Sequence, residues 1–205
     1  MDVLSKLFGS APLVKVMRLF LFQSDEAYDT ALIIERTKIS KDDARWILQL
    51  LEKIGFLKKK TFWKEVTVGK GKKQEHKKKR AKGYTLDEQF LYARPLRDLL
   101  IHTELLEDKE IERRLKKTGA IKLLIVAGVF INSEDARIDM LVVGDRLKQP
   151  LLERAIHTLE ADIGTEIRYV ILATSDFMYR KGVNDRLVRD VFDYTHHTII
   201  NKLDI

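Results

Sequence analysis

The sequence predicts an α+β protein whose two halves differ in their pattern of apolar residues. Residues 1–101 combine helical periodicity with one strongly basic segment, whereas residues 119–205 alternate strand-like and helix-like segments. The chain has 205 residues, enough for one large domain or two small ones, and its apolar fraction of 45% can supply a buried core. We expect an N-terminal domain of helices and a hairpin, a helical linker over 102–118, and a C-terminal α/β domain with a small mixed sheet.

Three helices are predicted in the first half. A proline opens the first, over about 12–23, which is apolar nearly all round and is therefore expected to be buried. The second is expected at about 29–37. Ser40, followed three residues later by a carboxylate, fits the N-cap of a third helix over 41–54. Gly55 is placed to end that helix, whose apolar residues recur at helical spacing: Ala44, Ile47, Leu48, Leu51 and Ile54.

The most basic part of the chain follows the third helix. Residues 58–82 contain 12 Lys and Arg against two Glu, a net charge of +10, so the rest of this +7 chain sums to −3. Such a local concentration of cations is typical of a surface that binds a polyanion. Extended segments at both ends predict a hairpin over 57–86, with a long tip around 69–80 that we expect to be mobile. Phe62 and Trp63 are expected to pack on the domain, and the alternative is that they stack on bases or wedge into a groove.

The order helix, helix, turn, helix, hairpin resembles a winged helix-turn-helix over about residues 11–101. The segments VKVMRLFLF and ALIIERTKISKDDARWILQLLEKIGFLKKK carry the resemblance. It implies that helix 41–54 lies in the DNA major groove, where Arg45 and Gln49 read base edges, and that the hairpin is a wing on the phosphates. The implied DNA-binding residues are Lys41, Arg45, Gln49, Lys53, Lys58, Lys59, Lys60, Lys70, Lys72, Lys73, Lys77, Lys78, Lys79, Arg80 and Lys82.

Both parts of this interface have a plainer interpretation. The charged residues on the exposed face of helix 41–54 sum to zero, so the face can equally be a solvated helix surface. The basic hairpin can be a charged loop that only adds solubility. In the linker, a thin apolar stripe fits either a helix that joins two domains or a dimer seam: Leu105, Leu106, Ile111 and Leu115.

The second half alternates strand and helix patterns. Strands are expected at 120–130, 137–145 and 165–174, and a helix is expected at 148–163. A short helix follows, with Thr174 or Ser175 as its N-cap, and residues 184–203 are expected to form one further helix. Strands alternating with helices in this way predict an α/β or α+β domain of about 85 residues.

Residues 119–195 resemble the minimal nucleotidyltransferase fold of the DNA polymerase β-like superfamily. The resemblance rests on a strand, a glycine, a loop and a second strand that reads IDMLVVGD. That family needs a Gly-Ser pair for nucleotide phosphate and an Asp-x-Asp pair for Mg²⁺. Gly128 is present, but Val129 replaces the Ser and Arg137 replaces the first Asp, which leaves Asp139 alone. The resemblance therefore implies a degenerate domain without transferase activity, because a fixed cation opposes metal binding.

Composition and spacing predict no cofactor and no metal site. Cys is absent, which excludes disulfides and Cys-based zinc sites, and the five His show no ligand spacing. No apolar run of about 18 residues predicts a transmembrane helix, and the N-terminus lacks the apolar stretch of a secretory signal. We expect a cytoplasmic protein.

These observations lead to the hypothesis of a transcriptional regulator that binds double-stranded DNA, as a homodimer facing two half-sites. The C-terminal domain would dimerise, sense a small molecule or hold a protein partner. One alternative is a Mg²⁺-dependent nucleotidyltransferase that acts on nucleic acid or protein, with Asp139 as a metal ligand. Another is an RNA-binding module that uses the same wing.

Overall fold

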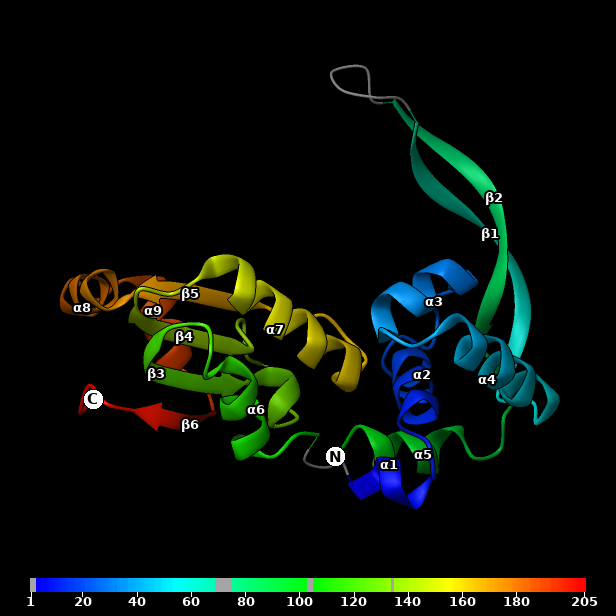
Figure 1. Ribbon diagram of the computed structural model, residues 1–205, viewed down its shortest axis with the longest axis horizontal. Coiled ribbons are helices and arrows are strands. Elements are labelled where there is room, and N and C mark those ends of the chain that lie inside the picture. Colours follow the sequence, from blue (N-terminus) through cyan, green and yellow to red (C-terminus); the bar gives the residue numbers. More distant parts are fainter. Residues whose placement is uncertain (1–2, 69–74, 103–104, 134) are drawn as a thin grey trace.

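The protein is an α+β molecule whose described residues form helices and two separate sheets. The computed structural model describes residues 3–68, 75–102, 105–133 and 135–205. Figure 1 shows two bodies side by side, which we call the N-terminal region (up to residue 102) and the C-terminal region (from residue 105 on). A long hairpin projects from the N-terminal region, away from both bodies.

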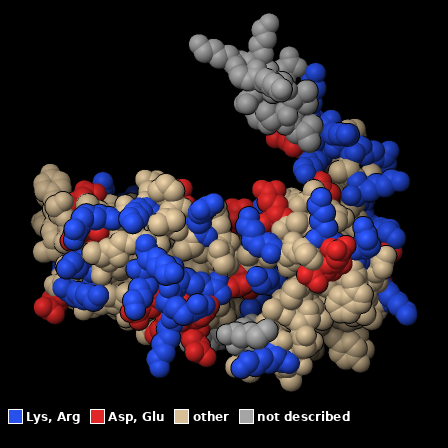
Figure 2. All heavy atoms as spheres, in the orientation of Figure 1, with Lys and Arg blue, Asp and Glu red and all other residues tan. Residues whose placement is uncertain are grey.

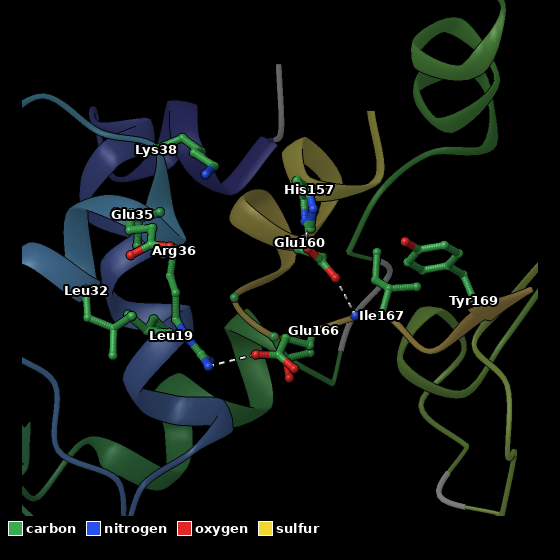
Figure 3. Close-up of a pocket in the computed structure, with 13 residues that line it drawn as sticks. Leu19, Leu32, Glu35, Arg36, Lys38, His157, Glu160, Glu166, Ile167 and Tyr169 are labelled. Carbon is green, nitrogen blue, oxygen red and sulfur yellow. Dashed lines mark hydrogen bonds and ion pairs between the residues drawn. The ribbon is translucent and has the colours of Figure 1, made fainter. Parts of the chain in front are cut away.

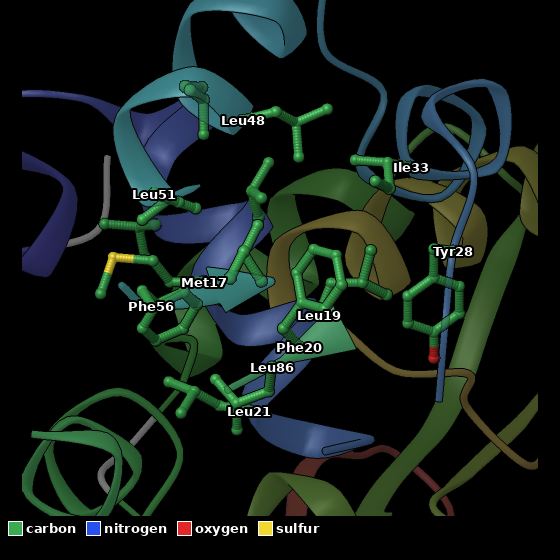
Figure 4. Close-up of a cluster of buried hydrophobic side chains, with 14 of the residues drawn as sticks. Met17, Leu19, Phe20, Leu21, Tyr28, Ile33, Leu48, Leu51, Phe56 and Leu86 are labelled. Carbon is green, nitrogen blue, oxygen red and sulfur yellow. The ribbon is translucent and has the colours of Figure 1, made fainter. Parts of the chain in front are cut away.

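The N-terminal region is built around a buried central helix. Its helices are α1 (Val3–Leu7), α2 (Ala11–Phe22), α3 (Thr30–Thr37), α4 (Lys41–Lys53) and α5 (Ala93–Leu100). α2 is buried along most of its length, as its sequence predicts, and contacts α3, α4 and α5. Figure 4 shows its side chains meeting those of the other elements, with Phe20 beside Tyr28 and Met17 beside Leu51 and Phe56.

α4 follows the predicted pattern closely. The side-chain oxygen of Ser40 accepts a hydrogen bond from the Asp43 backbone N–H at 3.0 Å, which confirms the expected N-cap. Four of the five predicted apolar positions are buried, and only Ile54, at the C-terminal cap, is exposed. The helix stops there because Gly55 takes a positive φ of 79°, a conformation that favours glycine.

The basic segment forms one regular antiparallel hairpin. β1 (Leu57–Val68) and β2 (Glu75–Leu86) are twelve residues each and pair from Leu57↔Leu86 to Val68↔Glu75. Residues 75–80 therefore belong to the strand β2 and not to a loop at the tip, and residues 69–74 lie outside the described chain. At the base, Tyr28 forms an isolated antiparallel bridge with Tyr84. Gly83 permits this approach, because a Cβ there would lie 2.2 Å from the Tyr28 carbonyl oxygen.

The C-terminal region is a mixed sheet with helices on both faces. Its strand order is β5-β4-β3-β6, formed by β3 (Ala120–Ala127), β4 (Met140–Asp145), β5 (Tyr169–Ala173) and β6 (His196–Asn201). β4 and β5 are parallel, and the other neighbours are antiparallel. α6 (Asp108–Leu115) and α7 (Gln149–Ile163) pack on one face. α8 (Thr174–Gly182) and α9 (Arg186–Asp193) pack on the other.

Several predicted elements of this region needed correction. The chain over 184–203 is not one helix: α9 ends at Asp193, and residues 196–201 form the edge strand β6. This strand supplies backbone partners for β3, and its β-branched Thr198, Ile199 and Ile200 suit a strand. The three predicted strands are also shorter than expected, since residues 128–130 form a 3-10 turn and the stretches before residues 140 and 169 are loops. The N-cap of α8 is Ala173, so Thr174 and Ser175 lie inside the helix.

The two regions meet where α2 and α3 contact α7. Arg18 of α2 is buried, and its guanidinium donates to the backbone oxygens of Leu100 and Asp162 at 3.0 Å each. Lys15, one turn earlier, pairs with the Asp162 carboxylate at 2.7 Å. These are the two cations that interrupt the apolar sequence of α2, and both face α7. None of the described helices is long and apolar enough to cross a membrane.

Candidate nucleic-acid interface and the Asp139 site

The exposed face of α4 carries all four of its predicted DNA-binding residues: Lys41, Arg45, Gln49 and Lys53. Arg45 has only a long 3.8 Å contact with Asp42, and both side chains are at least 75% exposed. Such an exposed pair contributes little to stability. These polar groups are therefore available to a partner that lies along the helix.

Trp46 also lies on this face, which the sequence analysis missed. Its indole is 54% exposed, although an aromatic ring of this size is usually found in a core. Helical geometry gives the signal that would have found it. Trp46 is four residues after Asp42 and three before Gln49, so these side chains share one stripe, beside the buried Ala44–Ile47–Leu48–Leu51 stripe.

Three lysines of β1 are paired within the fold. Lys58 contacts Asp87 at 3.2 Å, Lys59 contacts Glu52 of α4 at 2.6 Å, and Lys64 contacts Asp29 at 2.8 Å. Burial acts to raise the pKa of Asp29, but hydrogen bonds from Lys64 and the Leu32 amide hold it below its ordinary value. The Glu52 carboxylate raises the pKa of Lys59. These three lysines hold the hairpin against α3, α4 and the chain after β2.

The other cations of the described hairpin are exposed. Figure 2 shows Lys and Arg covering the visible part of the hairpin, with few carboxylates among them. Within the described chain, five of these cations have no ion pair: Lys60, Lys78, Lys79, Arg80 and Lys82. Lys77 is exposed beside them. Lys70, Lys72 and Lys73, which were also predicted to bind DNA, lie outside the described residues.

The expectation that both hairpin aromatics pack on the domain is wrong for Trp63. Phe62 is half-buried, but Trp63 is 68% exposed. Successive side chains on a strand point to opposite faces, so the two rings cannot share one environment. Trp63 pairs with Arg80, and its face of the hairpin also carries the pairs Thr61↔Lys82 and Glu65↔Lys78. We call this surface, from Lys59↔Tyr84 to Glu65↔Lys78, the Trp63 face.

Asp139 is fully buried and its carboxylate is surrounded by donors. Oδ2 accepts from the Arg168 backbone N–H at 2.8 Å and from its Nε at 2.9 Å. Oδ1 accepts from Arg168 Nη2 at 2.8 Å and from the Val129 N–H at 3.2 Å. This bidentate pair raises the pKa of Arg168, chiefly through the hydrogen bonds to Asp139. A carboxylate offers about four acceptor positions, and all are used here.

The other two positions of the predicted nucleotidyltransferase site are arranged differently. Gly128 lies against Asp139 with a φ of +52°, and a Cβ there would be 1.9 Å from Asp139 Oδ1. Arg137 is exposed and contacts Asp190 of α9 at 3.2 Å, so its charge is not beside Asp139. The cation at Asp139 is Arg168, which the sequence analysis missed. The register of β4 with β5 would have identified it, because Met140 pairs with Tyr169 and the preceding residues are therefore neighbours.

Cavities lie between the regions, and two of them have volumes close to 500 Å³. One, of about 500 Å³, is bordered by α3, the end of α7 and the chain into β5. Figure 3 shows Arg36 reaching across it to Glu166, and Glu160 accepting from the Ile167 N–H. No predicted site residue lines it. The other, of about 490 Å³, is lined by Gly128, Val129 and Arg168 together with residues of α2 and α5.

Among the described residues, no cluster of three or more His, Cys, Asp or Glu has the arrangement of a metal site. The candidate interface is thus the exposed face of α4 with the distal hairpin, and the Asp139 site is a separate, internally paired cluster. In comparisons with known proteins, no family model matches the chain, and no curated protein or solved structure matches it.

Proposed function

We propose that the protein is a DNA-binding transcriptional regulator of the winged helix-turn-helix type. The observation that carries the proposal is the row of exposed cations without internal partners on a hairpin that projects beyond the body. Lysines and arginines that pair with carboxylates of the fold have a structural role, but these do not. The base of the same hairpin contacts α4, whose exposed face carries an arginine, a glutamine and a tryptophan. Phosphate contacts from the hairpin would position the protein, and α4 would read base edges.

For the C-terminal region, we propose a role without nucleotidyl transfer, in dimerisation, sensing or partner binding. The arrangement around Asp139 supports this assignment. A metal ion at Asp139 would have to displace Arg168 from both carboxylate oxygens and would leave that guanidinium unpaired. A second carboxylate two residues away, which could share the ion, is replaced by Arg137.

The test is binding to random duplex DNA across a salt series. Replacing Lys77, Lys78, Lys79 and Arg80 with Gln is expected to weaken binding and to reduce the slope of log K against log salt by about 0.9 for each phosphate that the hairpin no longer neutralises. The matched control replaces four exposed lysines of the other region with Gln: Lys116, Lys117, Lys181 and Lys202. It changes net charge equally but should leave the slope unchanged.

Equal effects of the two quadruple variants would show that net charge alone drives association, and would contradict a specific hairpin contact. Absence of binding to duplex DNA at low salt would overturn the regulator proposal. Competition with RNA of the same length separates it from the RNA-binding alternative, since a regulator of this type should prefer duplex DNA.

A further inference from the structure

We propose that the Trp63 face of the hairpin binds unpaired DNA bases, so that the protein prefers duplex DNA containing an unpaired segment over fully paired duplex. The inference rests on the proposed DNA-binding function and specifies the ligand of one part of the interface. It starts from the exposed indole of Trp63, which has no function in the helix-and-wing interface described above.

The first step is that Trp63 is exposed because the fold turns it outward. Its neighbour Lys64, on the opposite face of β1, contacts Asp29 at the start of α3 at 2.8 Å. Phe62, on that same opposite face, is half-buried. Near residues 62–64, the opposite face of the hairpin is thus the one that lies against the N-terminal region. Trp63 points away from it and is 68% exposed.

The second step is that exposure of this ring has a cost that packing within the chain does not recover. An indole is one of the largest apolar surfaces a side chain can bury, and burying a large apolar side chain is favourable by about 1.5–3 kcal/mol. The flanking pairs Thr61↔Lys82 and Glu65↔Lys78 surround the ring with polar and charged groups instead. Thr or Lys at this position would fit an exposed site on a basic hairpin equally well and would leave no apolar ring in water. The ring therefore points to a ligand with a flat apolar face.

The third step identifies that ligand by charge. Arg80 lies directly across the hairpin from Trp63, and Lys78 and Lys82 are its neighbours on the same face. None of these three has an ion pair within the described chain. An aromatic ring among cations that can contact phosphates is the combination by which proteins hold single-stranded nucleic acid, with bases stacked on the ring. A base inside a paired duplex offers no free face, so the ring requires an unpaired or unstacked base.

The fourth step connects this face to the rest of the interface. Lys59, at the base of the Trp63 face, contacts Glu52 near the end of α4. The face and the exposed side of α4 therefore adjoin at the base of the hairpin. Duplex held along α4 would continue toward the hairpin, where an opened segment could meet the indole.

The experiment compares three DNA molecules of equal length and phosphate number. One is fully paired, one has a central bubble of mismatched thymines, and one has the same bubble made of abasic residues. The protein is expected to bind the thymine bubble at least about fivefold more tightly than the other two, which is the lower range for stacking one base. Trp63→Ala should remove this preference and leave binding to the paired duplex unchanged. Trp63→Phe should retain part of it.

Phe62→Ala is the matched control, since it removes a ring one residue away on the opposite face. It should keep the preference for the thymine bubble. Equal affinity for all three DNA molecules in the unaltered protein would overturn the inference while leaving the salt-dependent duplex binding of the proposed function intact. Equal weakening of paired and bubble binding by Trp63→Ala would overturn it in favour of a ring that wedges into a groove. If Trp63→Ala and Phe62→Ala both lost the preference for the thymine bubble, the loss would be due to distortion of the hairpin. That result would also overturn the inference.

Discussion

At the scale of single residues, the most informative group is Asp139. The resemblance in the sequence implied that it is the remaining carboxylate of a metal-binding pair, and the structure assigns it four hydrogen bonds, three of them from Arg168. A buried carboxylate with these partners connects the start of β4 to the chain entering β5 and to the turn at Gly128. Its burial and its pairing give this aspartate a structural role that requires no metal ion.

Asp139→Ala is expected to lower the free energy of unfolding by about 1–3 kcal/mol, because it leaves the backbone N–H groups of Val129 and Arg168 without their acceptor. Urea unfolding followed by circular dichroism measures this change. Arg137→Gln is the comparison, since it breaks only the exposed contact with Asp190 and should cost about 1 kcal/mol or less. Similar losses in the two variants would contradict the structural role assigned to Asp139.

At the scale of secondary-structure elements, α4 was the most predictable from sequence. Its N-cap, its apolar stripe and its glycine terminator are local features, and each acts within a few residues. The prediction of one helix over 184–203 was wrong for the opposite reason, because the structure of its last part depends on a distant segment. Residues 196–201 become a strand only because β3 needs a partner along its free edge, and that edge lies some 70 residues earlier in the chain. Periodicity in a short window does not include such a partner.

Ser40→Ala tests the cap that starts α4. The variant loses the hydrogen bond to the Asp43 N–H, and its stability should fall by about 0.5–2 kcal/mol. Ser175→Ala is the control, because Ser175 is exposed in the first turn of α8 and gives that helix no side-chain cap. It should change stability by less than about 0.5 kcal/mol. Chemical denaturation of both variants measures these changes. A Ser40→Ala variant as stable as the unaltered chain would contradict the role of Ser40 as the N-cap of α4.

At the scale of the whole molecule, a network of charges joins the two regions. Glu110 of α6 accepts from Arg113 and Arg114, Arg114 also contacts Asp162, and Asp162 pairs with Lys15 of α2. The hydrogen bond from Arg113, followed by that from Arg114, lowers the pKa of Glu110 from 4.5 to about 2. The sequence showed Lys15 and Arg18 as the two cations of an otherwise apolar helix. It did not show that both contact Asp162 of α7, where the two regions meet.

The lowered pKa of Glu110 determines how the stability of the protein depends on pH. A carboxylate with a lowered pKa in the folded state stabilises the fold above its ordinary pKa of 4.5, and that contribution is lost as the pH falls from 4.5 toward 2. Glu110→Gln should therefore be less stable than the unaltered protein near neutral pH, and the difference should shrink across this interval. Urea unfolding at several pH values measures it. Glu112→Gln, an exposed neighbour on α6, should show no such convergence, and a constant difference for Glu110→Gln would contradict the network.

The candidate interface was predictable from sequence only in part. The basic composition of residues 58–82 indicated a polyanion site, but it could not separate the lysines that hold the hairpin from those that are free. That division depends on Asp29, Glu52 and Asp87, which come from three other segments. Likewise, both Phe62 and Trp63 were expected to pack on the domain, although a two-residue period puts them on opposite faces of the strand. Which face is turned outward is set by the Lys64 contact.

The positions of the aromatic side chains have a spectroscopic consequence. The chain contains two tryptophans, and both Trp46 and Trp63 are exposed on the candidate interface while the cores contain none. Their emission should already be that of hydrated indole in the folded protein, so unfolding should shift it little. DNA lying on either ring should quench it. Intrinsic fluorescence would therefore follow occupancy of the interface almost independently of folding, and with Trp46→Phe the remaining signal would come from Trp63 alone.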